Sequence, residues 1–305
     1  MENSDPMRNQ IYLAALLHDI GKFYQRADEN LFVNGNKNNK TEIGDVSFTL
    51  ARTICPAKEN GRFGYHHVIW TSEFLERKSK MLKSFGLLQG AFDLLKETDD
   101  NLINLSVNHH RPQTPLQAIV TMADWWSAGI DRTQPNTFEK EEGEDDAKIQ
   151  WGKERYKKIP LYSIFNSIYD GKIINAFKLK SLDISEENFQ FPTKIESNLN
   201  ANDKSIYNEL WKKFFEEFDN LPANNINGFI ESLLYLLKKY TWAIPSNTMD
   251  MANVSLYEHF KTTAAFADCI YSYYSKHEFD FLWNNNDKRL TLKNGIYPVL
   301  LVSVN

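Results

Sequence analysis

Apolar residues recur every three or four positions along most of the chain, which is the spacing of a helix that buries one face. The first such run includes Ile11, Leu17 and Ile20, and we predict one buried helix that continues through "LLHDIGKFYQRA", residues 16–27. The same spacing predicts seven further helices, which are Val68–Lys83, Leu87–Lys96, Leu102–His110, Leu116–Ala128, Lys204–Asn220, Ile226–Lys239 and the segment that follows Val254.

Capping signals support several of these helix starts. Thr114 and Pro115 supply an N-cap and a first-turn proline, and an aspartate, Asp99 or Asp100, precedes the helix at residue 102. Ser255 and the glutamate three residues later form a capping box. The last helix is therefore expected to begin just after Ser255.

The pattern of apolar and polar residues over 133–200 differs from the helical pattern of the rest of the chain. These residues begin with an acidic stretch, "EKEEGEDD", that is typical of a solvated loop. After it we predict a short helix over residues 161–170 and short strands over residues 177–184 and 188–192. The chain finishes with "GIYPVLLVSVN", which has the character of a buried strand. We therefore expect a mainly α protein with a small mixed α/β insertion and a C-terminal β segment.

The composition narrows the class of protein. With 305 residues, 42% of them hydrophobic, the chain can bury a large core. Its net charge of −5 argues against a broad basic surface for nucleic acid, so any such contact must be local or supplied by partners. No apolar run has the length of a membrane span, the first residues lack the layout of a signal peptide, and Cys55 and Cys269 lack a paired spacing. We predict a cytoplasmic protein without membrane contact or disulfide.

His18 and Asp19 are polar residues on a helix that otherwise has the pattern of core. Burying them without partners would cost several kcal/mol, so something must satisfy them. Other histidines and a second buried-looking carboxylate fall on other predicted helices, and these are His67, His109, His110 and Asp124. Imidazoles with carboxylates suit first-row divalent metals such as Mn, Fe, Co, Ni or Zn. Two such ions, bridged by an aspartate, can hydrolyse a phosphodiester.

Lys22 lies one helical turn beyond His18 and would point the same way, where it could hold a phosphate oxygen. The alternative is an ordinary surface lysine whose stem covers apolar residues, and the two interpretations are equally open. His277, near the end of the chain, has no neighbour of ligand character and is expected at the surface.

Five motifs together resemble a known family. They occur in the order "LLHDIGK", "HHVIWTSEFL", "NHHRP", "IVTMADWWSAGIDR" and "VSLYEHFKTTAAFA". In that order they resemble the N-terminal HD nuclease domain of the large catalytic subunit of type III-A CRISPR–Cas interference complexes, and the similarity spans nearly the whole chain. The resemblance implies a circularly permuted HD fold, in which the helix with the superfamily's opening histidine comes last. Here that residue is His259.

The resemblance also implies the site residues. One metal site would be made by His259, His18, Asp19 and Asp124. A second would be made by Asp19, His67, His109 and His110. Either residue of the pair His66 and His67 could be the ligand, and the spacing to Trp70 and Thr71 favours His67. His18, Asp19 and Lys22 are the catalytic candidates, and the cofactor would be one or two divalent transition-metal ions, Mn²⁺ first, with Ni²⁺, Co²⁺, Fe²⁺ or Zn²⁺ as alternatives.

The function implied by the resemblance is metal-dependent cleavage of single-stranded DNA within an antiviral effector. The implied partners are the other subunits of the type III-A ribonucleoprotein with its guide RNA. Residues 1–278 would form the HD domain, with the insertion at about 133–200, and residues 279–305 would start a truncated palm-like domain. The family's GGDD motif, which makes cyclic oligoadenylate from ATP, is absent from the sequence, so we expect no such synthesis. Three alternatives stay open: an HD-type nucleotide phosphohydrolase, a vestigial HD scaffold for assembly, and a purely structural metal site.

Overall fold

A computed structural model describes residues 5–28, 50–57, 63–87, 96–129, 155–168, 175–183, 192–194, 204–248 and 252–295. Its α-helices are α1 (Pro6–Leu17), α2 (Ile20–Ala27), α4 (His67–Arg77), α5 (Ser79–Ser84), α6 (Leu102–Val107), α7 (Pro115–Ser127), α8 (Arg155–Lys158), α9 (Lys204–Phe218), α10 (Ile226–Thr241) and α11 (Leu256–Tyr274). Three short 3₁₀ helices are η1 (Asn108–His110), η4 (Ile164–Ile168) and η5 (Glu278–Asp280). The strands are β1 (Leu161–Tyr162), β2 (Asn175–Phe177), β3 (Thr193–Lys194), β4 (Phe281–Asn284) and β5 (Arg289–Leu292). The prediction of a mainly α fold is confirmed.

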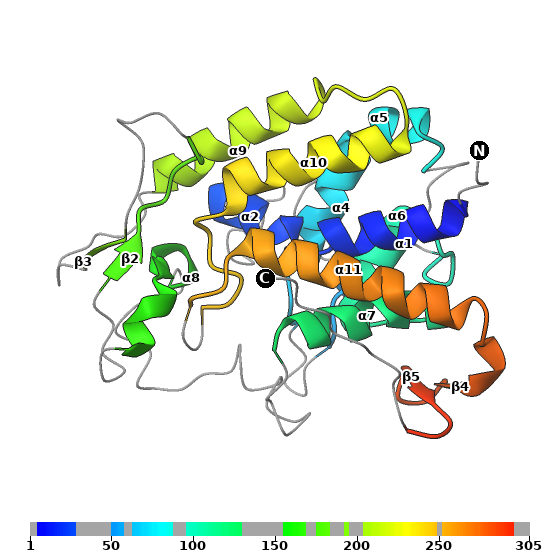
Figure 1. The fold of residues 1–305 in the computed structure, drawn as a ribbon. Coiled ribbons are helices and arrows are strands. Elements are labelled where there is room, and N and C mark those ends of the chain that lie inside the picture. The colour runs from blue at the N-terminus through cyan, green and yellow to red at the C-terminus, as the bar shows by residue number, and fades with distance from the viewer. Residues whose placement is uncertain are drawn as a thin grey trace, which may run out of the picture.

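Helix α1 lies at the centre of the helical body. It packs against α11, α6 and α7, while α2 packs against α4 and α9 (Figure 1). Its run from Leu13 to Leu17 is fully buried, while its polar residues Arg8, Asn9 and Gln10 lie in the first half of the helix. Along the seam with α11, Arg8 donates two hydrogen bonds to Asp268, at 2.6 and 2.7 Å, and the Tyr271 hydroxyl donates to Asp5 at 2.8 Å. The two ends of the helical domain are therefore joined side by side.

The prediction of one continuous helix through residues 11–27 is wrong, because the helix breaks between Leu17 and Ile20. Asp19 has φ −103° and ψ 10°, outside the helical region. A side chain from α4 satisfies the backbone at the break: the Thr71 hydroxyl donates to the His18 carbonyl at 2.9 Å and accepts the Gly21 amide at 3.1 Å. This partner lies some fifty residues away, so local spacing did not reveal the break.

Other predicted helices are shorter than the pattern suggested. The helix over 68–83 is divided at Lys78 into α4 and α5, and the helix over 102–110 ends at residue 107 and continues as η1. Thr114 and Ser255 cap their helices as predicted, since their side chains accept the amides three residues on. Asn101, rather than Asp99 or Asp100, caps α6. Residues 88–95 of the helix predicted over 87–96 lie outside the described residues.

The insertion is mixed α/β, but its elements lie elsewhere than predicted. Strands β1, β2 and β3 form an antiparallel sheet in that order, with Leu161 opposite Phe177 and Ala176 opposite Thr193. The helix predicted over 161–170 is wrong, because its start is β1 and only η4 follows. The strand predicted over 177–184 is wrong in position, since β2 ends at residue 177. Residues 188–191 of the second predicted strand lie outside the described residues.

The β-hairpin β4–β5 follows α11 and packs against α7, as Figure 1 shows at the red end of the chain. The buried strand expected in the last residues lies outside the described part of the chain, as does the whole acidic stretch. Cys55 is buried and Cys269 is exposed, and the structure joins neither of them in a disulfide. Among the described helices, none is both long enough and apolar enough to cross a membrane.

Candidate metal centre

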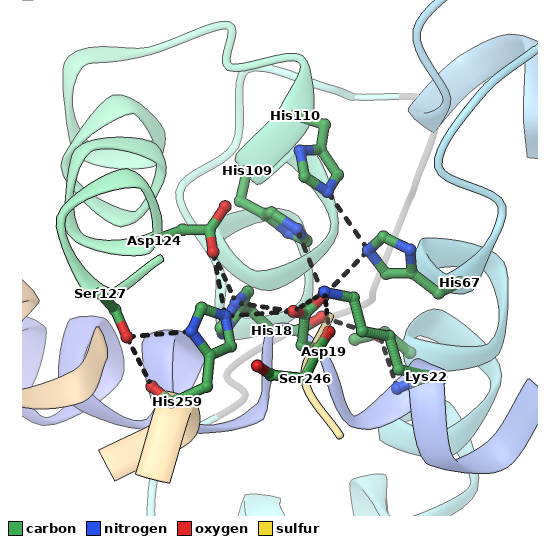
Figure 2. Close-up of polar contacts among 12 residues, drawn as sticks. His18, Asp19, Lys22, His67, His109, His110, Asp124, Ser127, Ser246 and His259 are labelled. Atoms are coloured by element: carbon green, nitrogen blue, oxygen red, sulfur yellow. Dashed lines mark hydrogen bonds and ion pairs between the residues drawn. The ribbon is translucent and has the colours of Figure 1, made fainter. Parts of the chain in front are cut away.

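Side chains from α4, η1, α7 and α11 converge on the break between α1 and α2 (Figure 2). The break presents the HD dipeptide, α4 contributes its first residue, η1 contributes two consecutive histidines, α7 contributes an aspartate near its end, and α11 contributes a histidine in its first turn. These residues are His18, Asp19, His67, His109, His110, Asp124 and His259. The structure thus brings together every residue that the sequence suggested as a metal ligand.

Asp19 lies between two groups of ligand atoms. Its Oδ2 is 3.3 Å from Nε2 of His18 and 3.3 Å from Nε2 of His259. Its Oδ1 is 2.9 Å from Nε2 of His67 and 3.7 Å from Nε2 of His109. The two oxygens of one carboxylate therefore belong to two different clusters, which is the arrangement of a bridging ligand.

The first cluster consists of His18, Asp19, Asp124 and His259. Asp124 Oδ1 lies 3.1 Å from Nε2 of His259 and 3.4 Å from Nε2 of His18. All four side chains are nearly or fully buried. The distant histidine of α11 thereby meets the HD dipeptide, which is the placement that the permuted arrangement requires.

The second cluster consists of Asp19, His67, His109 and His110. His110 Nε2 lies 3.3 Å from Nε2 of His67, and the His110 ring stacks on Tyr65 with their centroids 3.8 Å apart. Of the two adjacent histidines in "YHH", it is His67 whose ring reaches Asp19, while His66 is the N-cap residue of α4. His277 lies far along the chain at the surface, with 48% of its side chain exposed, as predicted.

Several buried ligand atoms lack hydrogen bonds within the part of the chain that the structure describes. They are Nε2 of His18, His109 and His259 and Oδ1 of Asp19. A buried polar group without a partner costs about 1–3 kcal/mol, so this concentration in one place is unfavourable unless a cation is present. Because a metal lies about 2.0–2.2 Å from N or O ligands, two of its neighbouring ligands stand about 3.0–3.5 Å apart. Most of the spacings in both clusters fall in or near that range.

Two of these histidines have the Nδ1 atom hydrogen-bonded to a backbone carbonyl. His18 Nδ1 lies 2.6 Å from the Ala15 carbonyl, and His109 Nδ1 lies 2.6 Å from the Ser106 carbonyl. Because a carbonyl oxygen only accepts, each Nδ1 carries the proton and donates it. In the neutral ring this leaves the lone pair on Nε2, which is the form in which an imidazole ligates a metal.

The charges in the site are strongly coupled. Burial tends to raise the pKa of Asp19 and of Asp124. The opposing charges outweigh burial and hold the pKa of both carboxyls well below the usual range: Lys22 and His18 act on Asp19, and His18 also acts on Asp124. Burial also tends to lower the pKa of His18, but the two carboxylates outweigh it and raise the pKa to about 10. Burial and the nearby His18 lower the pKa of His109 to about 3, so that ring stays neutral. The carboxylate pair therefore requires a positive charge, whether a proton or a cation.

Lys22 reaches the site, as one of the two interpretations of the sequence suggested. Its Nζ lies 2.6 Å from Asp19 Oδ2 and donates to the Ser246 carbonyl at 3.3 Å. About a quarter of the side chain, 27%, remains exposed. The lysine therefore connects the buried carboxylate with the outside of the site.

Sequence reasoning missed the supporting residues. Ser127 contacts His259, Thr71 holds the break between α1 and α2, and Gly21 lies so close to α4 that a Cβ atom there would collide with the His67 carbonyl. A small residue three positions after Asp124 could have drawn attention to Ser127, because residues i and i+3 share a helix face. Nothing local distinguishes Thr71.

Fold and site together define a mainly α protein with a two-part centre of buried histidines and aspartates around an HD dipeptide. No family model matches the chain. It is 31% identical over 284 residues to the single-strand-specific deoxyribonuclease Cas10/Csm1 (subtype III-A) of Methanocaldococcus jannaschii, which covers 87% of this chain and 28% of that protein. The protein of the same name from Thermococcus onnurineus is 30% identical over 258 residues, with 84% and 26% covered. The chain is thus homologous to Cas10/Csm1 of type III-A CRISPR systems, as its motifs predicted.

The chain spans little more than a quarter of the length of these curated relatives. Among solved structures, it is similar to Csm1 of T. onnurineus, with 23% identity, a TM-score of 0.43, and coverage of 86% of this chain and 28% of that one. A Csm1–Csm4 subcomplex of the type III-A interference complex gives 22% identity and the same TM-score.

Proposed function

We propose that this chain is a divalent-metal-dependent HD nuclease domain that cleaves single-stranded DNA within a type III-A CRISPR effector. The observation that carries the proposal is the pair of clusters that share Asp19, whose buried nitrogen and oxygen atoms include four that have no hydrogen bond to any described residue. They occur in a chain homologous to proteins whose name is single-strand-specific deoxyribonuclease. Together these features favour phosphodiester hydrolysis over a single structural metal site.

Each site residue has a role in this proposal. His18, Asp124 and His259 would hold one ion with Asp19, and His67, His109 and His110 would hold a second. A pair of divalent ions supplies charge stabilisation and an activated water for the hydrolysis of a phosphodiester. Lys22, whose ammonium group is partly exposed beside Asp19, would turn to a phosphate oxygen and orient the strand.

The buried position of the centre favours a single strand as the substrate. The carboxylates and most of the histidines lie below the surface, so the scissile phosphate must approach closely. A flexible single strand can bend into such a site, whereas a duplex must be deformed at a cost in free energy. The net charge of −5 leaves little to retain a duplex by electrostatics alone.

The proposal includes the domain organisation and the partners. Residues 1–278 would form the HD domain with its insertion at about 133–200, and residues 279–305 would begin a palm-like domain. The partners would be the other subunits of the type III-A ribonucleoprotein and its guide RNA, in the cytoplasm. The native ion would be Mn²⁺, with Ni²⁺, Co²⁺, Fe²⁺ or Zn²⁺ as alternatives.

The test incubates the purified chain with Mn²⁺ and, side by side, labelled single-stranded DNA, duplex DNA, RNA and deoxynucleoside triphosphates. We expect single-stranded DNA to be cut first. Asp19→Asn keeps the shape of the side chain and removes its charge, so it should abolish cleavage and lower the number of bound Mn²⁺ ions. The matched control is Asp287→Asn, at an exposed turn position, which should change neither quantity.

The outcomes separate the alternatives. Hydrolysis of free nucleotides alone would indicate a nucleotide phosphohydrolase, and Mn²⁺ binding without hydrolysis of any substrate would indicate a structural site. An inactive chain that binds no Mn²⁺ would indicate a vestigial scaffold. Cleavage of duplex DNA at least as fast as single-stranded DNA would contradict the proposed substrate.

A further inference from the structure

Ser127 lies at the end of α7 and contacts Nδ1 of His259. Among the described residues, it is the one side chain hydrogen-bonded to Nδ1 of a first-cluster histidine. We infer that Ser127 is a positioning residue that fixes the tautomer of His259, so that its Nε2 lone pair faces Asp124 and Asp19. The inference rests on the proposed metal centre, because a fixed tautomer matters only if Nε2 is a ligand.

The hydrogen-bond partners of the hydroxyl determine the direction of each bond. Ser127 Oγ lies 3.1 Å from the His259 carbonyl and 2.9 Å from His259 Nδ1. A hydroxyl has one proton, and a carbonyl oxygen can only accept. We assign the hydroxyl proton to the carbonyl, so that the hydroxyl presents a lone pair to Nδ1. In this assignment Nδ1 carries the ring proton, and Nε2 keeps its lone pair.

The other two inward-facing histidines of known tautomer do not need such a residue. His18 and His109 each donate from Nδ1 to the backbone carbonyl three residues earlier, namely that of Ala15 or Ser106. Those acceptors are present whatever the side chains are. His259 lies in the first turn of α11 and takes its Nδ1 partner from a different helix. Its tautomer therefore depends on one replaceable side chain.

Two residues of α7 contact the two nitrogens of the His259 ring. Asp124 Oδ1 lies 3.1 Å from Nε2, and Ser127 Oγ lies 2.9 Å from Nδ1 (Figure 2). The two residues are three positions apart and so share one face of the helix. If Ser127 were absent, the proton would favour Nε2, where it could be donated to either carboxylate. It would then occupy the lone pair that the metal needs.

The first measurement needs no metal. Nitrogen-15 spectra of the histidine rings in the metal-free 305-residue chain at pH 8 report which ring nitrogen carries the proton, and the His259 signals are assigned by their loss in His259→Gln. We expect the proton on Nδ1 in the parent and on Nε2 in Ser127→Ala. Ser127→Thr retains the hydroxyl and should restore the parent form. An unchanged tautomer in Ser127→Ala would overturn the inference.

The second measurement is calorimetric titration with Mn²⁺. Loss of a residue that orients a metal ligand typically weakens metal affinity about 10–100-fold, and we expect a loss of this size in Ser127→Ala and recovery in Ser127→Thr. Ser84→Ala, at an exposed position on α5, is the matched control and should bind as the parent does. A threonine variant that folds, by circular dichroism, but stays as weak as the alanine variant would contradict the inference. If the parent itself binds no Mn²⁺, the proposed function fails, while the spectra still decide the role of Ser127.

Discussion

Replacing Gly21 by alanine should destabilise the protein, although alanine normally stabilises a helix more than glycine does. Gly21 is the second residue of α2, and α2 crosses α4 at this point. A Cβ atom placed there would lie 2.7 Å from both the amide nitrogen and the hydroxyl oxygen of Thr71, and closer still to the His67 carbonyl. Two of these three atoms belong to the backbone of α4 and cannot rotate away.

The magnitude follows from two opposing effects. Real Cβ contacts essentially never fall below 3.0 Å, so α2 must move away from Thr71 by at least 0.3 Å, the difference between 3.0 and 2.7 Å, and by more at His67. Overpacking of this kind costs about 1–3 kcal/mol. The helix propensity of alanine recovers at most about 1 kcal/mol. We therefore expect a net loss, together with weaker Mn²⁺ binding, because Asp19 and His67 lie on opposite sides of the contact.

The assay is urea-induced unfolding, followed by circular dichroism, of Gly21→Ala and of Gly228→Ala. Gly228 also lies in the first turn of a helix, α10, but a Cβ atom there would lie 3.6 Å from the Asn225 side chain and 4.0 Å from the Ala223 Cα atom, which are ordinary contacts. Its alanine variant should be as stable as the parent or up to about 1 kcal/mol more stable. If both variants gain stability alike, the close packing of α2 on α4 does not constrain the site and the reasoning is refuted.

Three further predictions concern the site and the helices around it. His259→Ala should weaken or remove one Mn²⁺ ion and leave the second, as measured by metal content and calorimetry, while His277→Ala at the surface should match the parent; equal metal content in both variants would contradict the assignment of the first cluster. Lys22→Met should weaken binding of single-stranded DNA about tenfold, since a charge-assisted hydrogen bond to phosphate contributes about 1.5–3 kcal/mol, while Mn²⁺ affinity should not fall; joint loss of both would point to a structural lysine. Glu217→Gln should make the melting temperature less dependent on pH in the acid range. Burial tends to raise the pKa of Glu217, but Lys239 at 2.8 Å and Tyr240 at 2.7 Å lower it. A carboxyl whose pKa is lower in the folded state stabilises the folded protein at pH values above its unfolded-state pKa, and this stabilisation is lost as the pH falls through the folded-state pKa. The parent and the variant should therefore differ in melting temperature near pH 7 and converge below about pH 4. A difference that stays constant with pH would argue against this link between α9 and α10.

Three of the proposed metal ligands could be predicted from the sequence because they are polar residues at positions where the pattern is apolar. His18, Asp19 and Asp124 are polar residues at positions that apolar spacing assigns to the core, and such exceptions stand out without any structure. His259 has no such local signal, since the first turn of a helix is often polar, and it was found only through the resemblance. The geometry that unites them had to come from the fold.

The missed features depend on contacts between segments that are distant in sequence. The break before Ile20 is stabilised by Thr71 of α4, and the β1 strand of the insertion is fixed by pairing with Phe177 and by a hydrogen bond from Tyr162 to the Ala252 carbonyl. Strands of two or three residues have too few positions to show a period. Local spacing therefore predicted the long helices well and the insertion poorly.

The seam between α1 and α11 has a consequence for the growing chain on the ribosome. Arg8 and its partner on α11 are separated by 260 positions. At a synthesis rate of about 5–20 residues per second, roughly 10–50 s pass between the emergence of α1 and that of α11. During this interval the nascent chain already contains His18, Asp19 and Asp124 but has no His259 with which to complete the first cluster. Because translation fixes this order, a metal ion held by the first cluster, as proposed, could bind there only after the helical body had been almost entirely made.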